Sequence, residues 1–149
     1  MGIDLNPARA TGLRAVAGTV VVLLTASCTL NEDESLADSR WFVIAVDGSS
    51  AVPGTNPLIV FGADDTVDGN GGCNDFLGTY QTTADRLRIG SFGSTLSSCG
   101  DSEAKALEEI LFDVLHSDPF FELSGKSLRL TSPEGTTVVL DADPVGESS

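Results

Sequence analysis

The chain has 149 residues, with 22 acidic and 8 basic side chains and a formal net charge of −14 at pH 7. Such an acidic surface repels nucleic acids and anionic lipid headgroups, so neither is expected to bind by simple attraction. The sequence has one histidine and three cysteines, and we predict neither a metal site nor a cofactor.

Residues 1–27 have the features of an export signal. Arg9 and Arg14 provide a basic start, and residues 15–26 form an uncharged, largely apolar run. A run of this length suits a signal-peptide core and is short for a membrane span. The small residues that end in Cys28 resemble the lipobox of bacterial lipoproteins, in which that cysteine is lipidated. We therefore predict an exported protein that is lipid-anchored at Cys28 to a membrane of the cell envelope. The alternative is an ordinary secretory signal that leaves Cys28 as an unpaired thiol.

Three further segments follow the signal. Residues 28–39 are acidic and poor in large apolar groups, which predicts a disordered tether. Residues 40–142 hold the apolar patterns of a single folded domain. Residues 143–149 are predicted to be a flexible tail.

Most of the domain is predicted to be β-strand. β-Branched and aromatic runs end at Gly, Pro, Asp or Ser clusters, which is typical of strands and turns. The predicted strands are 41–46, 58–61, 75–81, 86–89, 120–123, 127–131 and 136–142. Asp64 and Asp65 are expected to turn the chain, and the glycine-rich residues that follow are expected to form a sharp turn before residue 75.

One helix is predicted after residue 100. Asp101 or Ser102 supplies its N-cap, and Pro119 stops it. An apolar stripe at helical spacing consists of Ala104, Leu107, Leu111, Val114 and Leu115. Since strands greatly outnumber helices, we predict an α+β fold, with an antiparallel, barrel-like β-sheet and one packed α-helix.

Several residues form a pattern over the domain. These are Trp41, Gly72, Cys73, Asn74, Phe76 and Gly78, followed by Cys99 before the helix. In this pattern residues 40–142 resemble the META domain family (HslJ-like). The resemblance implies a role in envelope stress or antibiotic tolerance, and no reaction is assigned to the motif residues of that family.

Cys73 and Cys99 are interpreted as a disulfide bond. Two cysteines within one exported domain usually pair when their Cα atoms lie within about 7 Å. The alternative is a redox or metal-binding thiol pair, for which a Cys-x-x-Cys spacing or further ligands would be expected.

Four other groups of residues are candidate sites. Asn74 is interpreted as a turn-stabilising amide. Asp64, Asp68 and Asp75 match an EF-hand calcium loop only in part, and we interpret the match as coincidental. His116 is expected to interact with the helix dipole. A last group, of basic residues, is either a patch for a carboxylate or phosphate, or ordinary solvent-facing strand residues: Arg86, Arg88, Lys126 and Arg129.

The sequence thus predicts a non-enzymatic cell-envelope lipoprotein with a binding or structural role. Its expected partners are the membrane, through the lipid anchor, and an unknown envelope protein or cell-wall component. The alternative is a binding module for an apolar small molecule, with a pocket near Trp41 and Phe76. An enzyme is a third hypothesis, for which a Cys73–His116 pair would require a reduced thiol.

Overall fold

The computed structural model describes Gly18 and residues 35–142. The predicted lipidation site Cys28 and the predicted tail 143–149 lie outside the described residues, as does nearly all of the predicted signal peptide. In the part of the chain that is described, no helix combines the length and the apolar character needed to cross a membrane.

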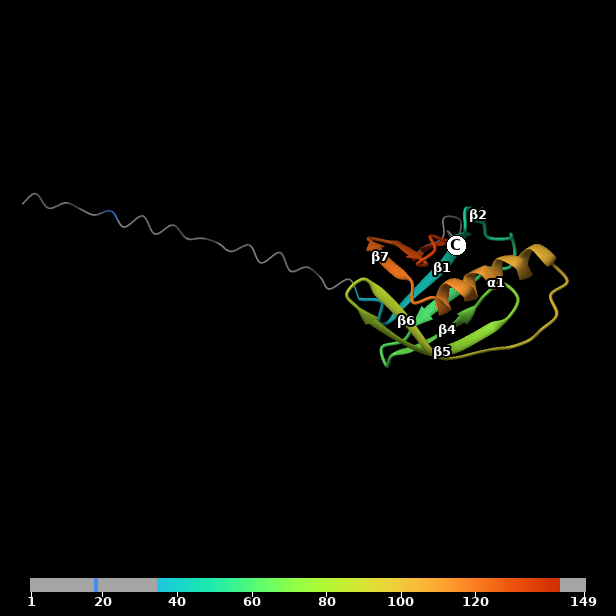
Figure 1. The fold of residues 1–149 in the computed structure, drawn as a ribbon, viewed down its shortest axis with the longest axis horizontal. Coiled ribbons are helices and arrows are strands. Elements are labelled where there is room, and N and C mark those ends of the chain that lie inside the picture. Colours follow the sequence, from blue (N-terminus) through green and yellow to red (C-terminus); the bar gives the residue numbers. More distant parts are fainter. Residues whose placement is uncertain (1–17, 19–34, 143–149) are drawn as a thin grey trace, which may run out of the picture. The chain divides into compact units, whose positions relative to one another are not determined.

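Antiparallel strands of the described domain form one sheet, and the pairing of β1 with β9 closes it into a barrel (Figure 1). The strands are β1 (Ser39–Val46), β2 (Ser49–Ser50), β3 (Leu58–Phe61), β4 (Thr66–Asn70), β5 (Asp75–Thr83), β6 (Arg86–Ser94), β7 (Phe120–Ser124), β8 (Ser127–Thr131) and β9 (Thr137–Asp141). The two-residue strand β2 pairs only with the end of β1, among the pairings that the structure describes. The predicted fold class is confirmed.

Alternating inward and outward side chains along most of the strands fill the barrel with apolar groups. In β5, Phe76, Gly78 and Tyr80 point inward while their neighbours are exposed, as the period of two in a strand requires. The side chains with no exposed area are Ile59, Phe61, Val67, Leu87, Leu115, Leu128, Leu130, Val138 and Leu140. The interior is therefore a packed core.

The helix α1 (Ser102–His116) packs against β1, β6 and β9 (Figure 1). Its N-cap is Asp101, whose Oδ1 accepts hydrogen bonds from the backbone N–H of Glu103 at 2.9 Å and of Ala104 at 3.1 Å. The predicted apolar stripe faces the barrel, with Leu111 1% exposed and Leu115 fully buried.

The structure corrects two parts of the sequence interpretation of the sheet. Residues 66–70, for which no strand was predicted, form β4, and β6 continues to Ser94, well beyond the predicted end at residue 89. In β4 only Val67 is a strong strand former, so local propensity gave little signal. Pairing with β3 and β5 on both sides makes it a strand.

The predicted boundary between tether and domain at residue 40 is also wrong. Leu36 is 2% exposed and belongs to the hydrophobic core, and β1 begins at Ser39. The isolated leucines of this acidic segment, Leu30 and Leu36, offered too little apolar area to predict burial from the sequence. The remaining tether residues, 28–34, lie outside the described residues.

Candidate functional site: a polar clamp at the motif turn and an arginine-lined hollow

The motif turn between β4 and β5 approaches α1 closely. Gly72 has a φ of +115°, which an L side chain rarely adopts. A Cβ on Gly71 would lie 2.7 Å from Cγ and Oε2 of Glu108 and 2.8 Å from Cε1 of Phe112. Two successive glycines are therefore needed, one for the turn and one for the contact between turn and helix.

Glu108 of α1 accepts three hydrogen bonds from this turn. Its Oε2 accepts from the backbone N–H of Cys73 at 2.8 Å and of Asn74 at 2.6 Å, and its Oε1 accepts from Asn74 Nδ2 at 2.6 Å. Both side chains are buried, with Glu108 4% and Asn74 9% exposed. We name this pair the Asn74–Glu108 clamp.

The same asparagine also binds the segment that leads from β6 to α1. Asn74 Oδ1 accepts from Thr95 Oγ1 at 3.0 Å and from the backbone N–H of Ser97 at 2.6 Å. Its amide therefore donates to the helix and accepts from the segment after β6. These bonds use one of the two N–H donors and both acceptor sites of this buried amide within the protein.

The predicted disulfide bond joins Cys73 to Cys99, with the Cα atoms 5.7 Å apart. It connects the motif turn to the residues just before the N-cap of α1. The clamp and the disulfide therefore hold the same turn to the beginning and the middle of the helix. The alternative of a free redox or metal-binding thiol pair does not match the bonded state.

Glu108 was missed by the sequence interpretation. It lies four residues after Ala104 and three before Leu111, in the middle of the apolar stripe of α1. A carboxyl group on the buried face of a helix signals a specific partner, because an unpartnered one is costly to bury. That signal was present in the sequence.

The other motif residues lie in the core. Trp41 is 5% exposed and donates from Nε1 to Ser39 Oγ at 2.8 Å. Phe76 is 3% exposed and stacks on Phe92 with ring centroids 5.4 Å apart. At Gly78 a Cβ would lie 2.8 Å from the carbonyl oxygen of Gly90 on the neighbouring strand.

The side chain of His116, at the end of α1, contacts other residues of the protein. Its Nδ1 lies 2.7 Å from the carbonyl oxygen of Phe112, and its ring packs edge-on against Phe92 at 4.4 Å. With Cys73 in a disulfide, the structure does not bring together a thiol and an imidazole here.

The aspartates of the EF-hand-like pattern are engaged separately. Asp64 Oδ1 accepts from Thr66 Oγ1 at 2.6 Å, and this bond holds the pKa of Asp64 below its ordinary value. Asp75 accepts from Asn70 Nδ2 at 2.8 Å, at the other end of β4. Among the described residues, no group of three or more His, Cys, Asp or Glu side chains is placed to hold a metal ion.

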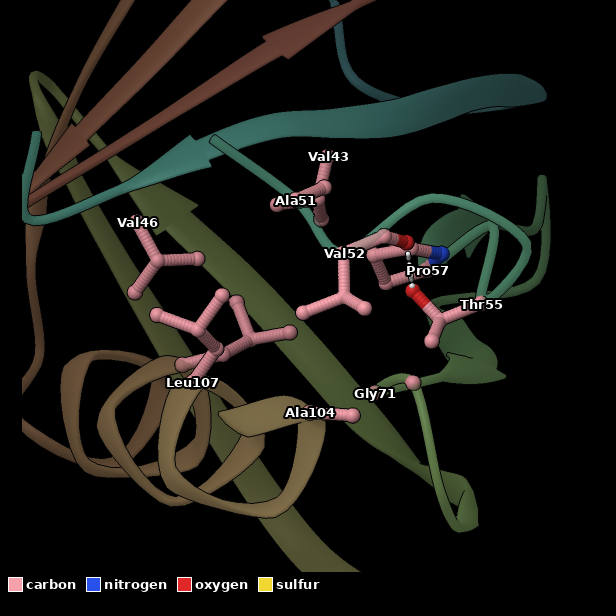
Figure 2. A pocket seen from close by; sticks show the side chains of 11 residues that line it. Val43, Val46, Ala51, Val52, Thr55, Pro57, Gly71, Ala104 and Leu107 are labelled. Carbon is pink, nitrogen blue, oxygen red and sulfur yellow. Dashed lines mark hydrogen bonds between the residues drawn. The ribbon is translucent and has the colours of Figure 1, made fainter. Parts of the chain in front are cut away.

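A small apolar cavity lies between α1 and the barrel (Figure 2). Its volume is about 10 Å³, which is close to the minimum that holds one water molecule. Figure 2 shows Val46 and Val52 on one side and Leu107 of α1 on the other. Trp41 and Phe76, the residues near which a pocket was expected, do not line it.

The basic residues of the sequence analysis are divided between β6, β8 and the turn between β7 and β8, and β7 lies between β6 and β8 in the sheet. Arg86 and Arg88 of β6 line a surface hollow of about 440 Å³ together with Gln81 and Thr83 of β5 and Asp118. Arg129 of β8 stands opposite Glu122 of β7 in the sheet register. Lys126, in the turn between β7 and β8, does not line the hollow.

These features define a small β-barrel domain in which a helix is fixed to the barrel by a polar clamp and a disulfide. The model of the META domain family matches residues 34–144. The chain belongs to the META domain family.

Solved structures of other proteins share the fold. One, determined by NMR, has 20% identity and a TM-score of 0.63, covering 70% of this chain and 89% of its own. A second NMR structure, from Burkholderia xenovorans, has 19% identity and a TM-score of 0.60, with 73% and 84% covered. The crystal structure of a DUF4847 family protein from Bacteroides vulgatus has 16% identity and a TM-score of 0.53, with 75% and 97% covered. The comparison with curated proteins gives no match.

Proposed function

We propose that this META-family chain is a non-enzymatic lipoprotein of the cell envelope, exported and anchored to a membrane at Cys28. Its role is to bind an envelope protein or cell-wall partner, or to support the envelope under stress or antibiotic exposure. The domain acts through its exterior in this proposal.

The Cys73–Cys99 disulfide is the observation that carries the proposal. Disulfides persist in oxidising compartments and are rare in the cytosol, so the bond supports export. It also consumes the two thiols of the domain, while His116 is held by Phe112 and Phe92. A nucleophile with an adjacent base, as nucleophilic catalysis requires, would have to come from other residues.

Intact mass of the protein extracted from membranes tests the anchor and the disulfide together. We expect a chain that begins at Cys28, carries the mass of acyl groups, and lacks two hydrogens relative to the reduced form. A mass that fits cleavage near Ala26 without acylation would refute the anchor. A chain with both internal thiols reduced in the native envelope would refute the exported, disulfide-bonded domain.

The alternative function is binding of an apolar small molecule. The cavity of Figure 2 is the observation in its favour, since its lining is mostly apolar. Its volume of about 10 Å³ means that α1 would have to move before a larger ligand could enter. Trp41, the only tryptophan of the chain, does not line the cavity but belongs to the same hydrophobic core as Val43, Val46 and Leu111, so its emission would report on a rearrangement of that core. A saturable change in its emission with an apolar probe such as decanoic acid would favour the alternative.

A further inference from the structure

The outer face of the β5–β6 hairpin carries a square of four polar side chains. Gln81 pairs with Arg88 across the two strands, and Thr83 pairs with Arg86. Residues two apart on a strand point to the same face, and directly opposed residues do so as well. All four side chains therefore stand on one face, and they line the hollow of about 440 Å³.

Two contacts orient the arginines. The Cζ atom of Arg86 lies 4.3 Å from the ring centroid of Phe120, so the guanidinium is stacked on an aromatic face. Stacking occupies the face of the guanidinium and leaves its edge N–H groups able to donate. Arg88 Nε lies 3.4 Å from Asp118 Oδ2, and its side chain is 71% exposed. A guanidinium has five N–H donors, and the ion pair with Asp118 engages only some of those of Arg88.

The lining of the hollow therefore contains several hydrogen-bond donors and few acceptors for them. Two guanidinium groups, the Gln81 amide and the Thr83 hydroxyl can all donate, whereas Asp118 is the carboxylate in the lining. Arginine edges match the planar or tetrahedral oxygens of carboxylates and phosphates, often with two parallel bonds. The acidic surface elsewhere opposes an approaching anion only weakly, because at 0.15 M salt charges beyond about 8 Å are largely screened.

We propose that this hollow binds an oxyanion, namely the carboxylate or phosphate group of a ligand, through Arg86 and Arg88. Gln81 and Thr83 add neutral donors, and Asp118 competes with the ligand for Arg88. The site goes beyond the proposed envelope role and does not depend on the lipid anchor.

Titration of the ¹⁵N-labelled full chain with inorganic phosphate and, separately, with acetate tests the site, with sodium chloride holding the ionic strength constant. We expect saturable shifts of the backbone amides of residues 81–88 and of Asp118. Saturation with phosphate alone identifies a phosphate ligand, and saturation with acetate alone identifies a carboxylate; either result supports the site. Shifts that do not saturate with either anion overturn it, while leaving the intact-mass test of the lipoprotein unaffected.

Substitutions distinguish binding at a defined site from general electrostatic attraction. Arg88→Gln should weaken binding by roughly tenfold or more, because a charge-assisted hydrogen bond is lost. Arg129→Gln makes the same change outside the hollow and should leave the affinity unchanged. Equal weakening by both variants would show general attraction and overturn the site.

Asp118→Asn gives a result that a purely structural role for Arg88 would not produce. Asp118 has a φ of +53°, a conformation that asparagine also tolerates, so the turn should be kept. Removing the competing carboxylate should tighten anion binding by about threefold. Weaker binding in a folded Asp118→Asn variant would contradict the proposed competition.

Discussion

The Asn74–Glu108 clamp and the β5–β6 hollow are both polar, but they use their hydrogen-bonding groups differently. In the clamp, N–H donors of the motif turn are hydrogen-bonded to Glu108, which is 4% exposed. In the hollow, Arg88 is 71% exposed and one ion pair engages only part of its donors. Polar groups that are satisfied inside a protein stabilise the fold, whereas exposed and oriented donors are available to a ligand. The family motif therefore points to architecture, and the exterior hairpin points to recognition.

The largest effect is expected for Glu108→Ala. The substitution leaves three N–H donors of the motif turn without their acceptor, and unsatisfied buried donors cost about 1–3 kcal/mol each. We expect the free energy of unfolding to fall by about 3–5 kcal/mol in urea denaturation.

Glu109→Ala is the matched control on the same helix. Glu109 is 67% exposed and lies 3.9 Å from Lys105, so its loss should change stability by less than about 0.5 kcal/mol. If the two variants were equally stable, the clamp would have no structural role.

The second prediction concerns the disulfide. The free energy of unfolding of the Cys73→Ser/Cys99→Ser double variant should fall by about 3.5 kcal/mol. This is the stabilisation expected when a disulfide closes a loop with a sequence separation of 26 residues in the unfolded chain. Urea unfolding of the oxidised protein, the reduced protein and the double variant measures this loss. The reduced protein and the double variant should have the same free energy of unfolding. If both were as stable as the oxidised protein, the clamp alone would hold the turn.

The third prediction uses Tyr80, on the inward face of the strand that bears Gln81. Its hydroxyl donates to the carbonyl oxygen of Gly62 at 3.0 Å, and burial, helped by Asp65 and Asp64, raises its pKa above 10.0. The folded state then holds the proton more tightly than the unfolded state. Stability should therefore be unaffected by this group below pH 10 and should fall as the pH rises beyond it.

Absorbance at 295 nm measures this ionisation without ambiguity, because Tyr80 is the only tyrosine in the chain. The midpoint should lie higher in the native protein than in urea. Tyr80→Phe should remove the corresponding part of the alkaline loss of stability, at a cost near 1 kcal/mol at neutral pH from the lost hydrogen bond. A native midpoint at or below the unfolded one would contradict the buried, hydrogen-bonded hydroxyl.

The smallest effect on stability is expected at the hollow itself. Arg86→Gln and Arg88→Gln should each change the free energy of unfolding by less than about 1 kcal/mol, since the contacts they lose are surface contacts. Urea denaturation beside the anion titration checks this. A loss as large as that of Glu108→Ala would mean that the arginines also serve the fold, and the contrast between the two regions would disappear.

The sequence predicted the strands in which β-branched and aromatic residues are dense, as in residues 41–46 and 127–131. It also predicted the helix, with Asp101 as one of its two candidate caps, and the pairing of Cys73 with Cys99. It failed at β4, where Val67 stands among polar residues and glycines, and at Leu36, whose neighbours are acidic and small. β4 is made a strand by its pairing with β3 and β5, and Leu36 is buried by the hydrophobic core. Neither contact can be read from the composition of the segment itself.

What the sequence determined by itself was the class of fold and the family, because periodicity, turn residues and the spacing of Trp41, Cys73 and Cys99 are local or linear signals. Only the tertiary structure decided the sites. Glu108 meets Asn74 across 34 residues, and Arg86 meets Phe120 through the pairing of β6 with β7. Helix packing and strand pairing create such neighbours, since hydrogen bonds and guanidinium contacts act over a few ångströms in space, whatever the separation along the chain.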